Sequence, residues 1–593
     1  MDRAPLHLVL LLLLTVTTFP LTLSISPDHF FRPSSAAPKS TLSGLEYKEF
    51  FEIIHPLPSD HLKPSCALHI IHHTFANTVN RPPFSTPYSP PSDCPPPWRH
   101  VSLEFRANSR GDQYDRISGL WLGGAELLRT STAEPTESGI FWIVRKDITR
   151  YSSLLSKTNI NFTIMLENVV NSVYTGVYHV DVTIFFYKDA AVRAPVTGGD
   201  HISIFPKDGG FGAKGLYESP ADLIIPISSF RDSKGYWFII ERDTDVHFRK
   251  LRFPDNTRRA VLELYVSFHG NDEFWYSNPS NNYIRMNNLT TLRGNGAFRE
   301  VFVTIDGMFV ASEVPFPVIF TGGINPLFWE PTVAIGAFDL PTYDFDLTPL
   351  LGVLLDGKDH VVGVGVSDGI SYWLVDANLH LWLDIGAASV EAKSVVYHNP
   401  GSSIKRQEEF RNLDGSFSIK GKRKTQLVGW IKSSAGNFTT TVMHQFKFRS
   451  SIRYGKNGNY KQARQDMKST REVKVMNEMG RLLTRITIKR TYPLKVVTLN
   501  LPGTKKDTYM LITNVSHSLI DTYSYGKFSS FVHNKQVANG WMEVKNHDVI
   551  AGEAVTNQTL ISRDESGCYV RTVAAIGGSL IIDNSTYGCP SFF

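Results

Sequence analysis

The sequence is poor in several features that mark specialised classes of protein. Its 593 residues include only four cysteines, so a disulfide-dense scaffold is excluded. The net charge is +5 with 20% charged residues, which is too dilute over this length to indicate a nucleic-acid-binding protein. Apolar residues make up 42% of the chain and aromatic residues 12%, which excludes a disordered or fibrous protein. The length predicts three or four globular domains.

Common catalytic and metal-binding signatures are also missing. No H-E-x-x-H or C-x-x-C motif occurs, so zinc peptidases have no support in the sequence. G-x-S-x-G occurs once, at Gly365–Gly369, but no helix is expected after it, so we interpret this run as a turn at a strand edge and not as the nucleophile turn of an α/β-hydrolase. His69, His72 and His73 form a histidine cluster, but no carboxylate or thiolate stands in register with them. We therefore expect no metal and no organic cofactor.

Long apolar runs are scarce as well. No stretch after the N-terminus reaches the roughly 18 uninterrupted apolar residues of a membrane-spanning helix, so no membrane segment is expected. At the N-terminus, Arg3 precedes the short apolar run Leu8–Leu14, and small residues follow as far as Ser24. This pattern predicts a signal peptide over residues 1–24 and entry into the secretory pathway, and it leaves open whether the protein ends outside the cell or in a vacuole.

Two further features fit an oxidising, secretory compartment. Four cysteines allow three disulfide connectivities, and we favour the two local pairs, Cys66 with Cys94 and Cys568 with Cys589. The candidate N-glycosylation sites, all in N-x-S/T sequons, are Asn161, Asn288, Asn437, Asn514, Asn557 and Asn584.

Two-residue alternation dominates the chain, and helical periodicity over three turns is almost absent. Runs such as Val101–Phe105, Phe141–Val144 and Val180–Tyr187 have the character of strands and are bounded by Gly, Asn and Asp. Many short strands separated by turn signals predict an all-β protein built from antiparallel sandwiches or jelly rolls.

Composition shifts divide the chain further. Residues 25–100 are rich in proline, and runs such as Cys94–Trp98 exclude helix and central strand. We expect an irregular arm there, held by the first disulfide, which could include a short helix around Tyr47–Glu52. Boundaries near 190–200 and 390–410 then delimit residues 101–190, 200–390 and 400–593.

The stretch 401–500 differs from the rest in charge. It holds 22 Lys and Arg against 6 Asp and Glu, so it is strongly basic in a chain that is otherwise acidic. Alternation in Arg481–Arg490 puts basic residues on a solvent face. The simplest interpretation is a solvated sheet face with basic, mobile loops at Lys420–Lys424 and Lys456–Arg471, and the alternative is contact with a polyanion or acidic glycan.

Carboxylates beside aromatic residues supply the candidate chemistry. Asp115 and Arg116 stand where a polar loop enters an apolar strand, Glu167 follows another strand, and Glu273 lies in the aromatic run Phe268–Ser277. A sugar site needs aromatic faces for the apolar side of a ring and acids that accept hydrogen bonds from hydroxyls. Acids gathered in a partly desolvated cleft also supply a general acid and a general base.

These segments resemble the plant-type peptide:N-glycosidase A family, the glycoamidases that release whole N-glycans from glycopeptides. The resemblance covers residues 45–400 densely and the C-terminal third more loosely. It is carried by the runs Cys94–Trp98, Tyr114–Arg116, Trp121–Gly124, Glu126–Pro135, Lys146–Ser152, Phe268–Asn278, Gly294–Gly296 and Gly322–Pro331.

The family is distantly similar to bacterial glycoamidases built from two jelly rolls with the active site between them. The resemblance therefore implies a jelly roll over 101–190, a second over 200–390, and a C-terminal β-rich domain over 400–593. Bacterial acidic positions match Asp115, Glu167 and Glu273, which implies that these three are catalytic, with Glu167 binding the hydroxyls of the first sugar. A looser match suggests His269.

The remaining roles are assigned from the same segments. Arg116 is expected to polarise the amide carbonyl or to neutralise Asp115, and Trp275 and Trp329 are candidate stacking platforms for substrate. Asp112, Glu126 and Glu134 have no bacterial counterpart, so turn and salt-bridge roles are expected for them.

The implied reaction is hydrolysis of the β-amide that joins Asn to N-acetylglucosamine, which leaves Asp in the peptide. N-glycopeptides and denatured glycoproteins are the expected substrates, with an acidic pH optimum. Val169 replaces a bacterial tryptophan, which implies room for core α1,3-fucose. Family members are often processed into heavy and light chains, and the basic stretch 400–475 is the expected place for a cut.

Three other interpretations stay open. A non-catalytic N-glycan-binding sandwich predicts binding without turnover, and a glycoside hydrolase predicts cleavage between sugars. A structural wall or storage protein would not need three acids in aromatic, polar loops. Conversion of Asn to Asp occurs only in the amidase.

Overall fold

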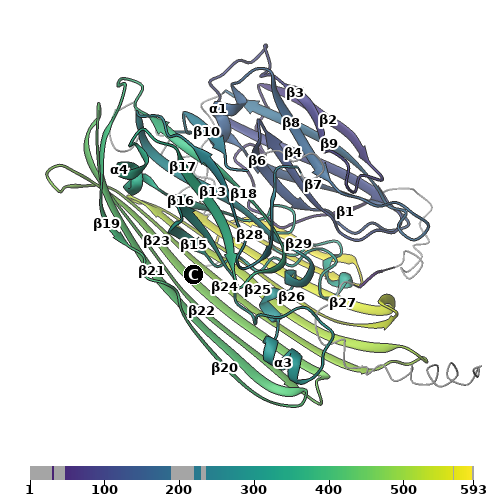
Figure 1. The fold of residues 1–593 in the computed structure, drawn as a ribbon. Coiled ribbons are helices and arrows are strands. Elements are labelled where there is room, and N and C mark those ends of the chain that lie inside the picture. The colour runs from purple at the N-terminus through teal and green to yellow at the C-terminus, as the bar shows by residue number, and fades with distance from the viewer. Residues whose placement is uncertain (1–29, 33–46, 189–218, 229–234, 565–566, 590–593) are drawn as a thin grey trace, which may run out of the picture.

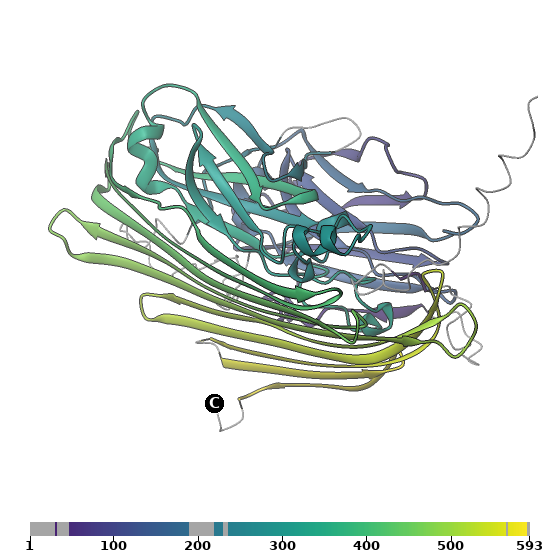
Figure 2. The ribbon, with the colours of Figure 1, turned by 60° about the horizontal axis from the view of Figure 1, so that its bottom comes forward.

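The computed structural model describes residues 30–32, 47–188, 219–228, 235–564 and 567–589 (Figure 1). Within them the chain forms two sandwiches of paired sheets and one long sheet that lies along both (Figures 1 and 2). The expected all-β fold is thus confirmed. The signal peptide expected at 1–24 and the boundary expected near 190–200 lie outside the described residues.

The first sandwich is built from a five-stranded and a four-stranded sheet. The larger sheet has the order β1 (Lys48–Phe50), β7 (Ile140–Asp147), β4 (His100–Arg110), β9 (Val177–Tyr187) and β2 (Cys66–Phe75). The smaller has the order β3 (Phe84–Tyr88), β8 (Ile160–Leu166), β5 (Ile117–Leu122) and β6 (Ala125–Ser131). Alternate residues of β9 are buried between the sheets, as its two-residue pattern predicts.

The proline-rich N-terminal region corrects one expectation, because it contributes three strands to this sandwich. Lys48–Phe50 is a strand where a short helix was considered. β2 and β3 are edge strands, where Pro87 removes no bond from the sheet interior. The outward face of β2 is polar and histidine-rich, and its register shifts between His69 and Ile71, so its alternation is weak in the sequence.

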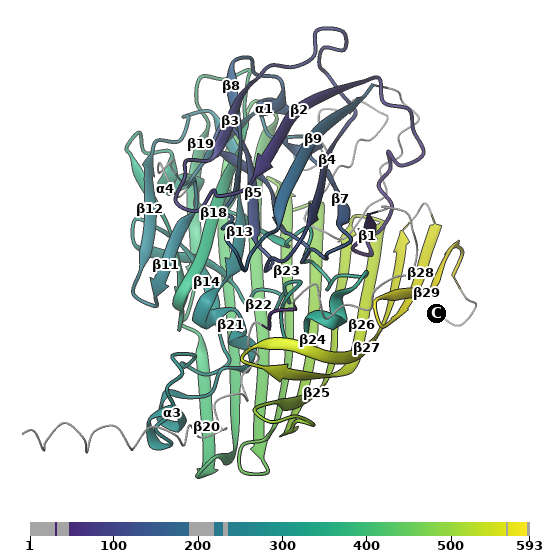
Figure 3. The same cartoon turned by 90° about the vertical axis from the view of Figure 1, so that its right-hand side faces the viewer.

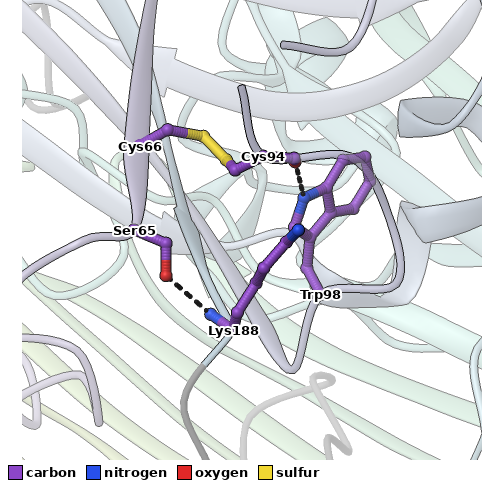
Figure 4. The surroundings of a disulfide bond; sticks show 5 residues. All are labelled: Ser65, Cys66, Cys94, Trp98 and Lys188. Carbon is purple, nitrogen blue, oxygen red and sulfur yellow. Dashed lines mark hydrogen bonds between the residues drawn. A yellow bond between two sulfur atoms is a disulfide. The ribbon is translucent and has the colours of Figure 1, made fainter. Parts of the chain in front are cut away.

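Both local disulfides are present, Cys66–Cys94 and Cys568–Cys589. The first fastens the start of β2 to the proline-rich loop before β4 (Figure 4). There Trp98 Nε1 donates to the Cys94 carbonyl at 2.8 Å, and Trp98 is buried against Phe186. The disulfide predictions are therefore confirmed.

The second sandwich follows the same plan. One sheet has the order β10 (Leu223–Pro226), β18 (Ile370–Leu383), β13 (Thr257–Phe268) and β16 (Thr342–Asp346), with β11 (Phe238–Arg242) also paired to β18. The other has the order β12 (Val246–Leu251), β17 (His360–Ser367), β14 (Glu300–Ile305) and β15 (Met308–Glu313). The helical segments are short and lie in connections: η3 (Thr149–Tyr151), α1 (Ser152–Leu155), η4 (Gly270–Asp272), η5 (Trp275–Ser277), α3 (Asn281–Met286), η6 (Pro326–Trp329), η7 (Thr348–Leu350) and α4 (Leu351–Leu354).

The C-terminal region is one antiparallel sheet of eleven strands, in which β20 pairs with β21 beside β19 (Figure 3). Its strands are β19 (Glu391–His398), β20 (Ser403–Arg411), β21 (Asp414–Ser433), β22 (Gly436–Gly455), β23 (Tyr460–Asn477), β24 (Leu482–Pro502), β25 (Tyr509–Tyr525), β26 (Phe528–Lys545), β27 (Asp548–Asp564), β28 (Gly567–Ile576) and β29 (Ser579–Tyr587). Along β22 every second residue is buried against the rest of the molecule.

The basic runs of this region are strands rather than the loops that were expected. Lys420–Lys424 lies inside β21, and most of Lys456–Arg471 lies inside β23. Their polar residues alternate with residues that face the buried side, such as Met467, and this buried half holds them in the sheet.

Candidate active site

Strand register brings three carboxylates to one edge of the first sandwich. Asp115 lies just before β5, whose first residue Ile117 pairs with Ser131 at the end of β6. The next residue of β5 pairs with Leu166 at the end of β8. The segments that leave β6 and β8 therefore emerge beside Asp115, and they carry Glu134 and Glu167.

The second sandwich brings its own residues to the junction. The last residue of β13, Phe268, pairs with Trp373 near the start of β18. His269 and Tyr372 extend this pairing, with the His269 N–H donating to the Tyr372 carbonyl at 2.9 Å and the reverse bond at 3.1 Å. The His269 ring stacks on Phe320 at 5.4 Å and on Tyr372 at 5.3 Å, and its Nε2 lies 2.8 Å from Ser267 Oγ.

The charges that act on two tyrosines show that the acids of the first sandwich and the residues of the second sandwich lie close together. Desolvation raises the pKa of Tyr372, and the negative charges of Glu167 and Glu273 raise it further while Arg116 lowers it. Burial likewise raises the pKa of Tyr178, which Asp115 and Glu134 raise further and Arg116 lowers. Arg116 is thus the cation common to both groups of acids.

Gly322 fixes how closely two of the acids approach. A Cβ atom on Gly322 would lie within 2.5 Å of both Asp115 Oδ1 and Glu134 Oε1, so these oxygens are at most about 5 Å apart. The loop between β15 and β16 can cover the pair only because this residue has no side chain. Glu134 was expected in a turn or salt bridge, but the structure places it beside Asp115. This closeness depends on the pairing of β5 with β6, which the sequence does not state.

Arg116 is held from two sides. Its Nη2 donates to Gln113 Oε1 at 2.6 Å, and its backbone exchanges bonds of 2.8 Å with Thr132. Gln113 in turn donates to Asn168 Oδ1 at 2.7 Å and to the Val169 carbonyl at 2.8 Å. The Arg116 Nε is buried and has no hydrogen-bond partner among the described residues.

The loop that carries Glu273 is fastened by its neighbour. Asp272 accepts from Arg299 Nε and Nη2 at 2.7 and 2.6 Å and from Trp373 Nε1 at 2.7 Å, and it is fully buried. Glu273 follows directly and is 4% exposed. Asp272 therefore holds the loop in place, and the adjacent Glu273 is the acid whose negative charge raises the pKa of Tyr372.

Glu167 lines a neighbouring cavity. The Asn80 N–H donates to its Oε1 at 3.1 Å. The cavity has a volume of about 330 Å³, and Arg81 and Phe84 line it with Glu167. A half-buried acid at such a wall can accept hydrogen bonds from sugar hydroxyls.

Comparisons with known proteins agree on one family. The model of "Peptide N-acetyl-beta-D-glucosaminyl asparaginase amidase A" matches residues 55–400. A Prunus dulcis protein named peptide-N4-(N-acetyl-beta-glucosaminyl)asparagine amidase A is 42% identical over 545 residues, which are 91% of this chain and 93% of the relative. The chain belongs to the amidase A family.

Solved structures match more remotely. PNGase F, a glycosylasparaginase from Flavobacterium meningosepticum, is 12% identical with a TM-score of 0.34, over 54% of this chain and 96% of the other. PNGF-II is 11% identical with a TM-score of 0.37, over 54% of this chain and 65% of the other.

Two aromatic residues expected at the site are corrected. Trp275 and Trp329 of this amidase A family member are 0% and 1% exposed, so neither indole face is open to a sugar. Trp275 packs edge-on against Phe268, and Trp329 Nε1 donates to the Gly323 carbonyl at 2.8 Å. Tryptophan is the largest side chain available to fill a sandwich core, and packing takes both of them.

The half-exposed aromatic residues next to Asp115 are tyrosines. Tyr114 and Tyr174 lie 5.6 Å apart, and both contact Phe31 of the N-terminal segment, at 5.3 and 5.7 Å. The sequence does not single them out, because tyrosine is common in β-proteins and their separation in the chain hides their contact. Among the described residues, the one cluster with metal-ligand spacing is Cys66, Asp93 and Cys94, whose sulfurs form the disulfide.

Proposed function

We propose that this protein is a glycoamidase that hydrolyses the β-amide between Asn and the first N-acetylglucosamine of an N-glycan. The products are an intact glycan and a peptide in which Asp replaces Asn. The observation that carries the proposal is the set of Asp115, Glu134, Glu167 and Glu273 around Arg116, in a chain of the amidase A family. N-glycopeptides and denatured glycoproteins are its substrates.

The site supplies what amide hydrolysis needs. An amide resists attack, so the carbonyl must be polarised, water activated and the leaving nitrogen protonated. The Arg116 guanidinium polarises the carbonyl oxygen as it becomes negative or neutralises Asp115, and Asp115 either accepts the proton of the water or holds the amide. Glu273 assists the water or the leaving glycosylamine, and Glu167 binds hydroxyls of the first sugar.

Replacement of Asp115 by Asn tests the proposal. Wild-type protein incubated with a defined N-glycopeptide at acidic pH should yield a bare peptide whose mass is that of the Asp form, and Asp115→Asn should yield none. Asp112→Asn, on the same loop, is the matched control and should keep activity.

Mass spectrometry separates the other interpretations in the same experiment. A peptide that retains one N-acetylglucosamine would mean cleavage between sugars and a glycoside hydrolase. A glycopeptide that is bound but left untouched by the wild type would mean a non-catalytic glycan-binding protein.

We also propose that core α1,3-fucosylated glycans are accepted because residue 169 is small. Val169 is half-buried beside Glu167, and its carbonyl accepts from Gln113. Val169→Trp should abolish cleavage of α1,3-fucosylated glycopeptide and spare the unfucosylated one, as measured by kcat/KM on the two substrates. Equal loss on both would contradict the size argument.

Compartment and processing belong to the same proposal. A secreted or vacuolar enzyme with paired carboxylates suits an acidic pH optimum. Any cut into heavy and light chains within 400–475 would fall at the turns that join β20 to β23, since the rest of this stretch is paired strand.

A further inference from the structure

The basic residues on the two faces of the long sheet differ in whether they have acidic partners. On the inner face, buried arginines have acidic partners: Arg423 with Glu300 at 2.7 Å and Arg471 with Glu313 at 3.0 Å. On the outer face of β21–β23 a group of exposed basic side chains forms what we call the basic face: Lys420, Lys422, Lys424, Lys447, Arg449 and Lys468. Among the described residues, Asp466 is the one acid within 4.0 Å of any of them.

The strand register places these charges directly opposite one another. Lys422 pairs with Lys447, Lys447 pairs with Lys468, and Lys420 pairs with Arg449. Neighbouring strands are about 4.8 Å apart, and alternate residues along a strand are about 7 Å apart. Like charges directly opposite in a sheet are destabilising, so the array lowers the stability of the sheet that carries it.

We propose that the basic face binds a linear acidic polysaccharide, one that carries a carboxylate or sulfate on successive sugars. A flat lattice of cations with a short repeat complements the charges of such a chain, and binding relieves the repulsion among the lysines. The outward neighbours Gln445, Thr470 and Ser451 are polar and can bond to hydroxyls. This surface is on the side of the sheet away from the sandwiches, so it acts independently of the amide-hydrolysing site (Figure 2).

The composition of the face favours this partner over other polyanions. Proteins that bind single-stranded nucleic acid place aromatic residues among their cations, and interfacial membrane binders present apolar side chains. The outward positions between the six cations hold neither. The sequon residues of the long sheet lie apart from the six cations. Asn437 stands at the start of β22, ten residues before Lys447, and Asn514, Asn557 and Asn584 are exposed on β25, β27 and β29, so glycans there would leave the basic face open.

Retention on immobilised polygalacturonate tests the proposal. Full-length protein should bind at low salt and elute as NaCl rises, because exposed charge pairs are screened. The variant Lys422→Gln/Lys447→Gln/Lys468→Gln should bind at least tenfold more weakly, and Lys506→Gln/Lys527→Gln/Lys545→Gln, at exposed positions elsewhere, should bind like the wild type. Both variants should cleave glycopeptide at the wild-type rate, and the first should melt at or above the wild-type temperature.

Three results would overturn the proposal. Equal binding of wild type and the 422/447/468 variant would show that the face is not used. Equal binding to fully methyl-esterified polygalacturonate would show that charge is not recognised. Tighter binding to anionic lipid vesicles or to RNA than to polygalacturonate would assign the face to a different class of partner.

Discussion

At the scale of single residues, Gly322 makes the strictest demand on the site. Gly322→Ala would put a methyl group within 2.5 Å of the Asp115 and Glu134 carboxylates and force at least one of them to move. Because displacements of this size at reacting groups are costly, we expect kcat/KM on glycopeptide to fall by about 100-fold. Thermal melting should change little, since the displaced atoms are ends of side chains.

Gly401→Ala is the control for this prediction, because a Cβ there meets nothing within 4 Å. It should leave both kcat/KM and the melting temperature unchanged. Wild-type kcat/KM for Gly322→Ala would contradict the close approach of the two acids.

The residues of the site differ in how far the sequence could predict them. Asp115 stood out as a candidate because it lies where a polar loop enters an apolar strand, and Glu273 because it lies within an aromatic run. Glu134 could not, because its closeness to Asp115 depends on the pairing of β5 with β6 and on the approach of Gly322 from the other sandwich. Trp275 and Trp329 were misassigned because exposed and buried tryptophans look alike in a sequence.

At the scale of elements, the loop after β13 depends on the buried pair of Asp272 and Arg299, both of which are 0% exposed. Arg299→Leu would leave a buried carboxylate without its cation, and we expect the free energy of unfolding to fall by about 3–5 kcal/mol. Turnover per folded molecule should fall as well, because the next residue is Glu273. Urea unfolding and kcat measure the two effects.

A surface pair provides the comparison. Lys250 and Asp359 lie 3.2 Å apart but are 65% and 49% exposed, so Lys250→Leu should change stability by less than about 1 kcal/mol. If Arg299→Leu were as mild as this, the buried pair would not be what holds the loop.

The two-residue alternation of polar and apolar residues predicts individual strands well, but it does not predict which strands pair to form a sheet. Val180–Tyr187 could be predicted because one of its faces is buried and the other is not. Strand β2 was missed because its exposed side is polar and its register shifts near His69. The single C-terminal sheet could not be predicted, since it follows from which strand pairs with which, and the sequence of each strand does not state its neighbour.

At the scale of the whole molecule, the inner face of the long sheet joins the C-terminal region to the second sandwich. Buried arginines on the sheet meet acids on β14 and β15, and His517 on β25 packs near Trp329 and Phe316. The same strands leave their outer cations to solvent. One sequence thus stabilises the assembly with half of its alternating positions and offers a charged surface with the other half.

We expect the packing of the long sheet against the second sandwich to weaken in acid, because His517 is buried in this contact. Burial lowers the pKa of His517 from 6.5 to about 4, so the unfolded chain binds a proton over this range that the folded chain does not. The stability due to the neutral ring is complete above pH 6.5 and is lost as pH falls toward 4, by about 3 kcal/mol. Glu52 acts in the opposite sense, because burial raises its pKa to about 7.

Comparison of variants separates these opposing effects. We expect His517→Gln to shrink the loss of unfolding free energy between pH 7 and pH 4 by about 3 kcal/mol relative to wild type, as measured by urea titration at the two pH values. His398→Gln, at an exposed position, should leave the difference unchanged. If both variants lost as much stability in acid as the wild type, the pH dependence would have to come from groups other than the histidine buried under the sheet.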